Sequence, residues 1–312
     1  MNLFSRLVSP WYPSVALGLE KGRASIVDLS RGRGGAYTLR RAATIGLSDS
    51  VIKPGFDEPN LLDPAELANT LRELSRSAGL LNQKRWSATL PEATTRTLII
   101  TLETQVGAEL DEVLRWKLER GFGSPPEELS ISTIRLEPEN GKERYLATAV
   151  RATVLAEYEE IFRSLGWRVG LVVPRHVGEA RWLSRMASAG DSLLISTAGE
   201  GFTALIVRAG QPFILRSVYC ERDECEDELY RLLLYYQERR GGQSETPAVP
   251  LQSLLVLGEG LGRERVANLV NATLGLNLGV LEPEDLGLEL PTRDLTFDQI
   301  AAPAGLATLS TD

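Results

Sequence analysis

Residues 15–29 have the sequence Val15-Ala-Leu-Gly-Leu-Glu-Lys-Gly-Arg-Ala-Ser-Ile-Val-Asp-Leu29, and residues 193–207 have the sequence Leu193-Leu-Ile-Ser-Thr-Ala-Gly-Glu-Gly-Phe-Thr-Ala-Leu-Ile-Val207. Each stretch is an apolar strand, a short turn that contains glycine, and a second apolar strand. A pattern that occurs twice predicts two related lobes that face each other, with a cleft where the two turns meet. Phosphate-binding versions of this arrangement supply backbone N–H groups and a carboxylate for a metal ion from these turns. Here the carboxylate is absent from both expected positions. The pattern therefore predicts that the fold is retained while the groups that bind phosphate and metal are lost.

The composition is that of a soluble globular protein with room for two domains: 312 residues, 43% hydrophobic and 24% charged. The net charge, 34 minus 42 or −8, argues against a general nucleic-acid surface. No apolar run approaches the roughly 18–20 residues that cross a bilayer, and residues 1–10 contain no secretory apolar region or cleavage site. Cys220 and Cys225 cannot make a disulfide framework of the secreted kind. We therefore expect a reducing cytoplasm.

A single histidine, His176, limits the enzyme classes that are available. Ser–His–Asp chemistry, or a metal site that uses histidine, would have to use this residue. It follows Pro174-Arg175 at the expected start of a helix, where a solvated capping role is predicted rather than a catalytic one. The run of Cys, Asp and Glu over residues 220–229 lacks a four-ligand spacing, and acidic residues are normal at a helix start. No catalytic residue and no metal site are predicted.

The order of apolar patterns divides the chain into two lobes and an insertion. Residues 1–86 and 168–188 are expected to form the first lobe, residues 189–312 the second lobe, and residues 87–167 an inserted α/β subdomain. The insertion has the order β-α-β-β-α, from strands near 97–102, 131–136 and 145–150 and helices near 110–118 and 155–165. The Gly/Arg run at residues 31–35 is predicted to be a hairpin turn, the alternative being an RNA-binding tract.

A third glycine turn, Gly258-Glu-Gly-Leu-Gly262, lies between a strand and a helix. Such a turn can let a ligand approach backbone N–H groups at the helix start. Its spacing is G-x-G-x-G, not the G-x-G-x-x-G of dinucleotide-binding proteins. Nucleotide contact and a tight turn without a ligand both remain open at this position.

These three turns, in this order and separated by an inserted subdomain, resemble the actin/hexokinase-type ATPase fold (ribonuclease H-like), and within it the type IV pilus assembly protein PilM family. Nearly the whole chain takes part, through weak motifs at Pro91 to Leu102, Leu110 to Arg135, Tyr145 to Leu183, Leu229 to Arg240 and Ile300 to Leu306. The resemblance implies a cleft for ATP and Mg. Its remnant would comprise Gly18, Lys21, Gly22, Gly199, Gly201, Thr203, Gly258 and Gly260.

Departures from the family pattern fall on the groups that would hold the nucleotide. The first Asp-x-Gly of the family, with the Lys that follows it, falls on Gly18, Glu20 and Ser25. The second falls on Ser196-Thr197-Ala198, and the Gly-Gly-Gly run of the third turn on Gly258-Glu259-Gly260. The helical subdomain that carries adenosine contacts in the family is largely deleted between residues 219 and 229.

These departures oppose the binding of a magnesium nucleotide. Glu20 and Glu259 would lie beside phosphates, and two unit charges about 4 Å apart repel by roughly 4 kcal/mol at an effective dielectric constant of 20. We therefore expect a pseudo-ATPase without ATP or Mg. The alternative is a shifted alignment, in which Asp28 or Glu200 supplies the carboxylate.

The resemblance implies a cytoplasmic scaffold, peripheral at the inner-membrane face. Its partner would be the short N-terminal tail of a PilN-like membrane protein, held in a groove between the first lobe and the insertion, with strand addition as a natural mode. A pilus motor ATPase or a second copy is a further possible partner, nucleic acid is not, and the membrane is contacted only through the partner. The groove residues are predicted to be Leu98, Ile100, Leu102, Trp116, Leu118 and Phe122, the alternative being that most of them are core.

Two other functions remain open. An active ATPase or small-molecule kinase of this fold would need a general base and a metal carboxylate, which the mapped positions lack. An FtsA-like filament protein would need a basic amphipathic helix at the C-terminus, which residues 308–312 do not provide. At the other end, Leu3, Phe4, Leu7, Val8 and Trp11 are either a membrane or partner contact or a frayed tail.

Overall fold

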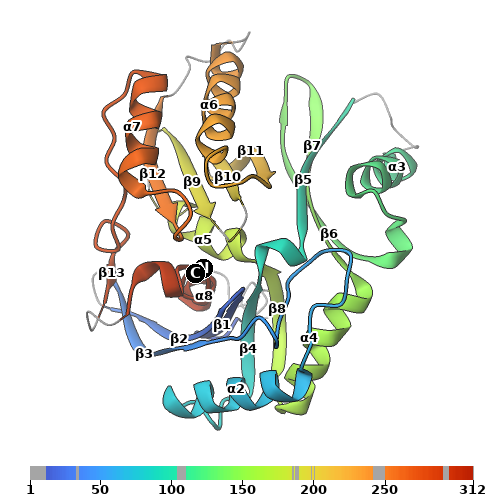
Figure 1. Ribbon diagram of the computed structural model, residues 1–312. Helices are drawn as coiled ribbons and strands as arrows, with labels where there is room; N and C mark the ends of the chain where they lie inside the picture. The colour runs from blue at the N-terminus through green and yellow to red at the C-terminus, as the bar shows by residue number, and fades with distance from the viewer. Residues whose placement is uncertain are drawn as a thin grey trace, which may run out of the picture.

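The computed structural model describes residues 12–32, 35–103, 110–184, 186, 190–197, 199, 201–241, 250–290 and 295–311 (Figure 1). Two sheets lie one above the other with helices between and outside them, and a third sheet stands beside them (Figure 1). No helix in these ranges has the length and apolar character needed to cross a membrane.

The first lobe is a six-stranded sheet in the order β13-β3-β2-β1-β4-β8. Strands β1, β2 and β3 form an antiparallel meander, and β4 and β8 extend the sheet beyond β1 as parallel strands. One face is covered by α2 and α4, which bury the predicted helix stripe Leu67, Leu71 and Leu74. The elements are β1 (Val15–Glu20), β2 (Arg23–Arg31), β3 (Tyr37–Gly46), α2 (Pro64–Ser77), β4 (Arg85–Leu90), α4 (Ala152–Ser164), β8 (Arg168–Pro174) and β13 (Leu288–Glu289).

The second lobe repeats the first in its central strands. In the first lobe β1 pairs antiparallel with β2 and parallel with β4, and in the second β9 pairs antiparallel with β10 and parallel with β12. The lobe has the order β11-β10-β9-β12, and α6 and α7 cover its outer face (Figure 1). The elements are β9 (Asp191–Thr197), β10 (Phe202–Arg208), β11 (Gln211–Val218), α6 (Cys225–Gly241), β12 (Leu251–Leu257) and α7 (Arg263–Leu274).

Two helices fill the space between the lobes. Helices α5 (Arg175–Ser184) and α8 (Phe297–Ala307) pack against each other and against both sheets. The predicted boundary between the two lobes at residue 189 stays a prediction. The C-terminal segment, however, is not confined to the second lobe. Strand β13 pairs with β3 of the first lobe, and α8 packs on β1 and β2.

The insertion is a three-stranded sheet, β5-β7-β6, with α3 on one face. It comprises β5 (Arg96–Glu103), α3 (Leu110–Phe122), β6 (Leu129–Glu139) and β7 (Lys142–Arg151), with two 3-10 helices, η1 (Glu92–Thr94) and η3 (Pro126–Glu128), at its borders. The helix expected near 155–165 is α4, and it differs from the sequence prediction in its packing. Its apolar side chains Val154, Tyr158, Ile161 and Phe162 belong to the first-lobe core, not to that of the insertion.

The two cysteines are joined in one disulfide, with 5.6 Å between the Cα atoms of Cys220 and Cys225. The turn that leads into α6 brings them together. This is a single local bond and not a framework, but it is a covalent link that the sequence analysis does not predict.

Candidate functional site

The three glycine turns meet in a cleft of about 340 Å³ between the lobes. Among the predicted remnant residues, Lys21, Gly199, Gly201, Thr203 and Gly258 line this cleft. Gly18, Gly22 and Gly260 are not among its lining residues: Gly18 is buried, Gly22 is exposed and Gly260 is half-buried. The other lining residues that matter here are Glu20, Arg23, Glu92, Arg175, Ser196, Thr197 and Glu259.

Gly18 lies in the middle of β1, opposite Ser25 of β2. A Cβ atom at this position would lie 2.7 Å from the Ser25 Oγ and 2.9 Å from the Cδ of Pro303 in α8. Contacts that short do not occur between real side chains, so neighbouring atoms occupy the place where the family pattern has an aspartate. The glycine is required by close packing, not by a turn.

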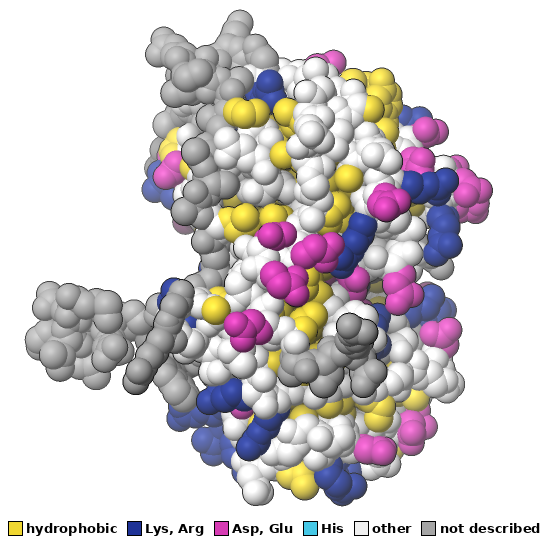
Figure 2. Space-filling view, turned by 90° about the vertical axis from the view of Figure 1, so that its left-hand side faces the viewer, with side chains coloured by type: hydrophobic (Ala, Val, Ile, Leu, Met, Phe, Trp, Pro, Cys, Tyr) yellow, Lys and Arg dark blue, Asp and Glu magenta, His cyan; other side chains and the backbone are white. Residues whose placement is uncertain are grey.

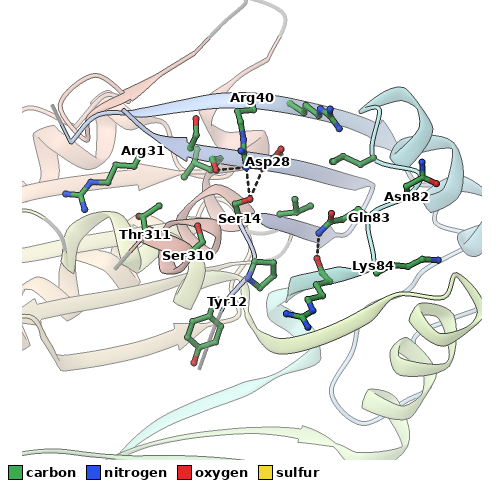
Figure 3. Close-up of a pocket in the computed structure, with 17 residues that line it drawn as sticks. Tyr12, Ser14, Asp28, Arg31, Arg40, Asn82, Gln83, Lys84, Ser310 and Thr311 are labelled. Atoms are coloured by element: carbon green, nitrogen blue, oxygen red, sulfur yellow. Dashed lines mark hydrogen bonds and ion pairs between the residues drawn. The ribbon is translucent and has the colours of Figure 1, made fainter. Parts of the chain in front are cut away.

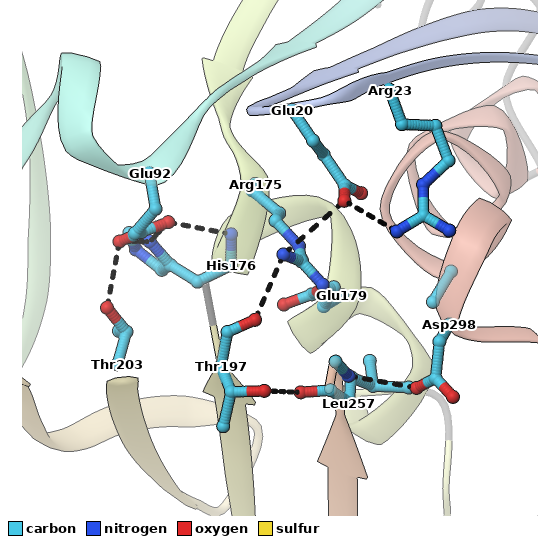
Figure 4. Close-up of polar contacts among 12 residues, drawn as sticks. Glu20, Arg23, Glu92, Arg175, His176, Glu179, Thr197, Thr203, Leu257 and Asp298 are labelled. Carbon is cyan, nitrogen blue, oxygen red and sulfur yellow. Dashed lines mark hydrogen bonds and ion pairs between the residues drawn. The ribbon is translucent and has the colours of Figure 1, made fainter. Parts of the chain in front are cut away.

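Two backbone N–H groups of the third turn are engaged by the protein itself (Figure 4). The Gly258 N–H donates to Asp298 Oδ1 at 2.9 Å, and the Gly260 N–H donates to Thr197 Oγ1 at 3.0 Å. The same Thr197 hydroxyl donates to the Leu257 carbonyl at 3.0 Å. Gly258 has φ +92°, and a Cβ there would lie 2.3 Å from the Thr197 carbonyl oxygen. The second and third turns are therefore bonded directly to each other.

Arg175, the first residue of α5, connects the first turn to the second (Figure 4). Its buried guanidinium donates to Glu179 Oε1 at 2.7 Å and to the Thr197 carbonyl at 3.1 Å, and it lies 3.6 Å from Glu20 Oε2. Burial opposes its positive charge, but Glu179 and Glu20 outweigh that effect and raise the Arg175 pKa. Burial raises the pKa of Glu20, which Arg175 and Arg23 only partly offset.

His176, the next residue, makes a second link between the lobes. Its Nδ1 lies 2.7 Å and 2.9 Å from the two carboxylate oxygens of Glu92, and its backbone N–H donates to Glu92 at 3.2 Å. The Thr203 hydroxyl of β10 donates to the same carboxylate at 3.0 Å. Burial lowers the His176 pKa, but attraction and hydrogen bonding to Glu92 outweigh it, so the pKa is raised. Burial alone would raise the Glu92 pKa, yet His176 holds it below its ordinary value.

The structure corrects the prediction of a solvated cap at His176. The residue is buried, because β8 runs into α5 without a loop and directs the first helical residues under η1. Sequence reasoning also missed Glu92, Arg175, Glu179 and Asp298. One signal was present: polar residues directly after the apolar run 169–173. Within the described ranges, no group of three or more His, Cys, Asp and Glu side chains is arranged to hold a metal ion.

The predicted partner-binding residues divide by burial. Ile100, Leu102, Leu118 and Phe122 are in the core between α3 and the inserted sheet, and Leu98 is partly buried against it. Alternate strand residues share a face, which is why three of the predicted residues on β5 point together toward α3. Trp116 differs, with 54% of its surface exposed on α3. A partner contact of Trp116 stays a prediction, whereas the four core residues are not available at the surface.

The opposite face of the inserted sheet carries a row of apolar side chains. Leu146 of β7 is directly opposite Ile99 of β5 and Ile134 of β6 in the strand register, so the three lie on one face. Ile134 is 58% exposed, and residues 132–135 of β6 are all exposed. β6 is also a terminal strand of its sheet. The exposed apolar side chain Ile134 therefore lies on the face of the inserted sheet opposite α3, on a terminal strand.

Scans against protein-family models and against curated proteins found no match. Among solved structures, a chain of a PilM–PilN type IV pilus biogenesis complex is similar over 97% of this chain and 100% of its own, with a TM-score of 0.75 and 18% identity. Weaker similarity is found to the cytoplasmic domain of EpsL, an inner-membrane component of the type II secretion system of Vibrio cholerae (TM-score 0.46, 13% identity, 83% and 93% of the two chains). A Bacteroides thetaiotaomicron protein with an actin-like ATPase fold gives a TM-score of 0.49 at 12% identity, over 96% and 98% of the chains.

The similarity to the chain of the PilM–PilN complex extends over nearly the whole length of both chains. Its extent agrees with the repeated strand topology of the two lobes, and the predicted fold class is confirmed. The chain has the two-lobed actin-like fold, and it shares that fold over nearly its whole length with a chain of the PilM–PilN complex.

Proposed function

We propose that the protein is a PilM-like scaffold of type IV pilus or related secretion assembly, which binds the N-terminal tail of a PilN-like membrane protein at the cytoplasmic face of the inner membrane. The observation that carries this proposal is the similarity to a chain of the PilM–PilN complex, which covers 97% of one chain and 100% of the other. A likeness that complete includes the inserted subdomain as well as both lobes.

We place the tail on β6 and on the apolar row Ile99, Leu146 and Ile134. A terminal strand presents unpaired backbone groups to which an extended peptide can add. β6 contacts α4, and its first residue, Leu129, pairs with Arg151 directly before that helix, so this edge begins beside the first lobe. Ile134 supplies an exposed apolar side chain for an alternate residue of the added strand.

We further propose that the interlobe cleft is that of a pseudo-ATPase. The described residues do not fit a magnesium triphosphate: Ser25 and Pro303 fill the place of the first carboxylate, and Asp298 and Thr197 accept from the Gly258 and Gly260 N–H groups of the third turn. Internal hydrogen bonds substitute for those that phosphate would make. An active ATPase or kinase, and an FtsA-like filament protein, are the alternatives.

A binding titration tests both parts. The probe is a fluorescent peptide with the cytoplasmic head of the single-span membrane protein encoded beside this gene, titrated with the full chain. We expect saturable binding that Ile134→Glu abolishes and that Leu62→Glu, an equally exposed apolar residue on the first lobe, leaves unchanged. Equal binding by both variants would contradict the β6 site. Isothermal titration with Mg-ATP is expected to give no heat of binding, and micromolar affinity would contradict the pseudo-ATPase proposal.

A further inference from the structure

Exposed apolar side chains gather on one helix of the second lobe. Helix α6 lies on the outside of that lobe (Figure 1), and one of its faces, which includes Leu229 and Leu233, is buried in the core. On its other face Tyr230, Leu234 and Tyr235 are 45%, 36% and 46% exposed. These are three of the eight large apolar side chains that are exposed in the described ranges, and the other five lie one each on other segments. Scattered apolar side chains are normal on a surface, whereas a cluster indicates a protein contact.

A pocket of the first lobe is polar by comparison. It has a volume of about 830 Å³, lies at the end of the lobe away from the interlobe cleft, and is lined mostly by polar residues that bond to one another (Figure 3). Asp28 accepts hydrogen bonds from the Ser14 hydroxyl and from Arg40, and the Gln83 amide donates to the Arg85 carbonyl. On the face seen in Figure 2, Lys and Arg gather over this lobe and hydrophobic side chains form small separate groups. Helix α6 differs, because both signs of charge lie beside its apolar side chains.

Two opposite charges flank Leu234 on the exposed face of α6. Arg231 and Glu238 are seven residues apart, which is two helical turns and places them on the same side of the helix. Within the described ranges the Glu238 side chain has no ion pair or hydrogen bond. Arg231 pairs with Glu228, but Glu228 has a second partner, Arg216, at 3.0 Å. Arg231 can therefore turn to another carboxylate without leaving Glu228 unpaired.

The order of these charges fits a second copy of the same helix in one orientation. In an antiparallel pair with its two-fold axis next to Leu234, Arg231 of each copy lies opposite Glu238 of the other, so two reciprocal ion pairs form. In a parallel pair each charge would meet its own like, which is unfavourable. Tyr230 and Tyr235 lie on either side of Leu234 and supply the apolar contact between the copies. Flanking charges set the partner and the orientation of paired helices.

We propose that the protein forms an antiparallel two-fold dimer through the exposed face of α6. The helix has 17 residues, a length of about 25 Å. The face of one helix is a small interface, so we expect the dimer to be weak and reversible. A two-fold contact is closed and does not continue into a filament. The inference goes beyond tail binding, and it requires neither the peptide nor β6.

Sedimentation velocity of the full chain at about 1 to 300 μM tests the dimer, because weak complexes dissociate in this range. We expect the weight-average sedimentation coefficient to rise with concentration toward that of a dimer. Arg231→Glu alone, or Glu238→Arg alone, turns both attractions into repulsions and is expected to weaken the dimer by about tenfold or more. Arg163→Glu on α4 is the matched control. Arg163 is a similarly exposed arginine that also pairs with a glutamate three residues before it, and this variant should dimerise as the unaltered chain does.

Exchange of the two charges tests the orientation. Arg231→Glu/Glu238→Arg restores both ion pairs in the reverse order, so it should dimerise as strongly as the unaltered chain. The two single variants, each weak alone, should pair with each other when they are mixed, because the mixture again places opposite charges face to face. Added salt should reduce the differences among the variants.

The outcomes decide the proposal. A chain that stays monomeric over the whole range, or a dimer that Arg231→Glu leaves unchanged, would overturn it. Failure of both the double variant and the mixture to dimerise would overturn the antiparallel register. Leu234→Glu should abolish the dimer, whereas Leu81→Glu, at an exposed leucine of the first lobe, should not. Because these experiments contain no peptide, their failure leaves the tail-binding proposal standing, and the reverse holds too.

Discussion

The hairpins β1–β2 and β9–β10 have the same topology but are stabilised by different chemistry. The first turn presents the carboxylate Glu20 between two arginines, Arg23 and Arg175. In the second hairpin, the described groups that bond across the cleft are neutral: the Thr197 hydroxyl accepts from the third turn, and the Thr197 carbonyl accepts from Arg175. A repeated scaffold therefore does not impose repeated chemistry, because each turn is completed by whatever packs against it.

Removing the buried charge of Arg175, which contacts both hairpins, is expected to give the largest loss in stability. Arg175→Met leaves Glu20 and Glu179 without their shared partner, and removing one member of a buried pair costs about 3–5 kcal/mol. Chemical denaturation monitored by circular dichroism measures the loss in the free energy of unfolding. Arg23→Met is the control, because Arg23 faces the same Glu20 from a more exposed position and should cost about 1 kcal/mol or less. Similar losses for both variants would contradict a central role for Arg175.

Placing an aspartate at the expected carboxylate position should destabilise the first hairpin more than the second. In Gly18→Asp the new side chain meets Ser25 and Pro303, so we expect a loss of about 3 kcal/mol from overpacking and no gain of Mg-ATP binding. Ser196→Asp is the equivalent change in the second hairpin, and its side chain borders the cleft, so a smaller loss is expected. Thermal unfolding with and without Mg-ATP measures both. Tighter nucleotide binding by Gly18→Asp would show that the cleft can still accept a metal.

The bond between the second and third turns is expected to have an intermediate effect. Thr197→Val keeps the shape of the side chain but leaves the Gly260 N–H without its acceptor, at a cost of about 2 kcal/mol. Ser217→Ala, which removes a partly buried hydroxyl bonded to Thr203, serves as the milder comparison. Denaturation midpoints at equal denaturant slope give the difference. A neutral Thr197→Val would mean that the turns are held by packing alone.

Breaking the Glu92–His176 pair is expected to have the smallest effect on the free energy of unfolding, and the size of that effect should depend on pH. The folded pKa of His176 is raised from 6.5, so its stabilisation is fully present below pH 6.5 and is lost as pH rises through the folded pKa. The pKa of Glu92 is lowered from 4.5, so its stabilisation is present above pH 4.5 and is lost as pH falls through the folded pKa. The difference in unfolding free energy between the unaltered chain and Glu92→Gln should therefore be largest between about pH 4.5 and 6.5, at about 1–2 kcal/mol. A difference that does not vary with pH would mean that the imidazole is neutral in the folded protein.

Sequence reasoning predicted the hairpins because they depend on local patterns, and it predicted the meeting of the turns because the same pattern occurs twice. Alternating apolar residues with glycine at a turn specify such a hairpin over about fifteen residues. It did not predict which face of the inserted sheet is covered by α3. Leu98, Ile100 and Leu102 satisfy the same apolar pattern whether α3 or a partner covers them, and the position of α3 decides.

The sequence by itself determined that two glycine-turn hairpins exist and that the first positions of both nucleotide motifs lack a carboxylate, since these are properties of adjacent residues. Only the tertiary structure decided which side chains pack against these turns. Pro303 reaches Gly18, Asp298 reaches Gly258 and Glu92 reaches His176 from distant parts of the chain. Such contacts are set by how helices and sheets pack around a shared core, and no local spacing in the sequence encodes that packing.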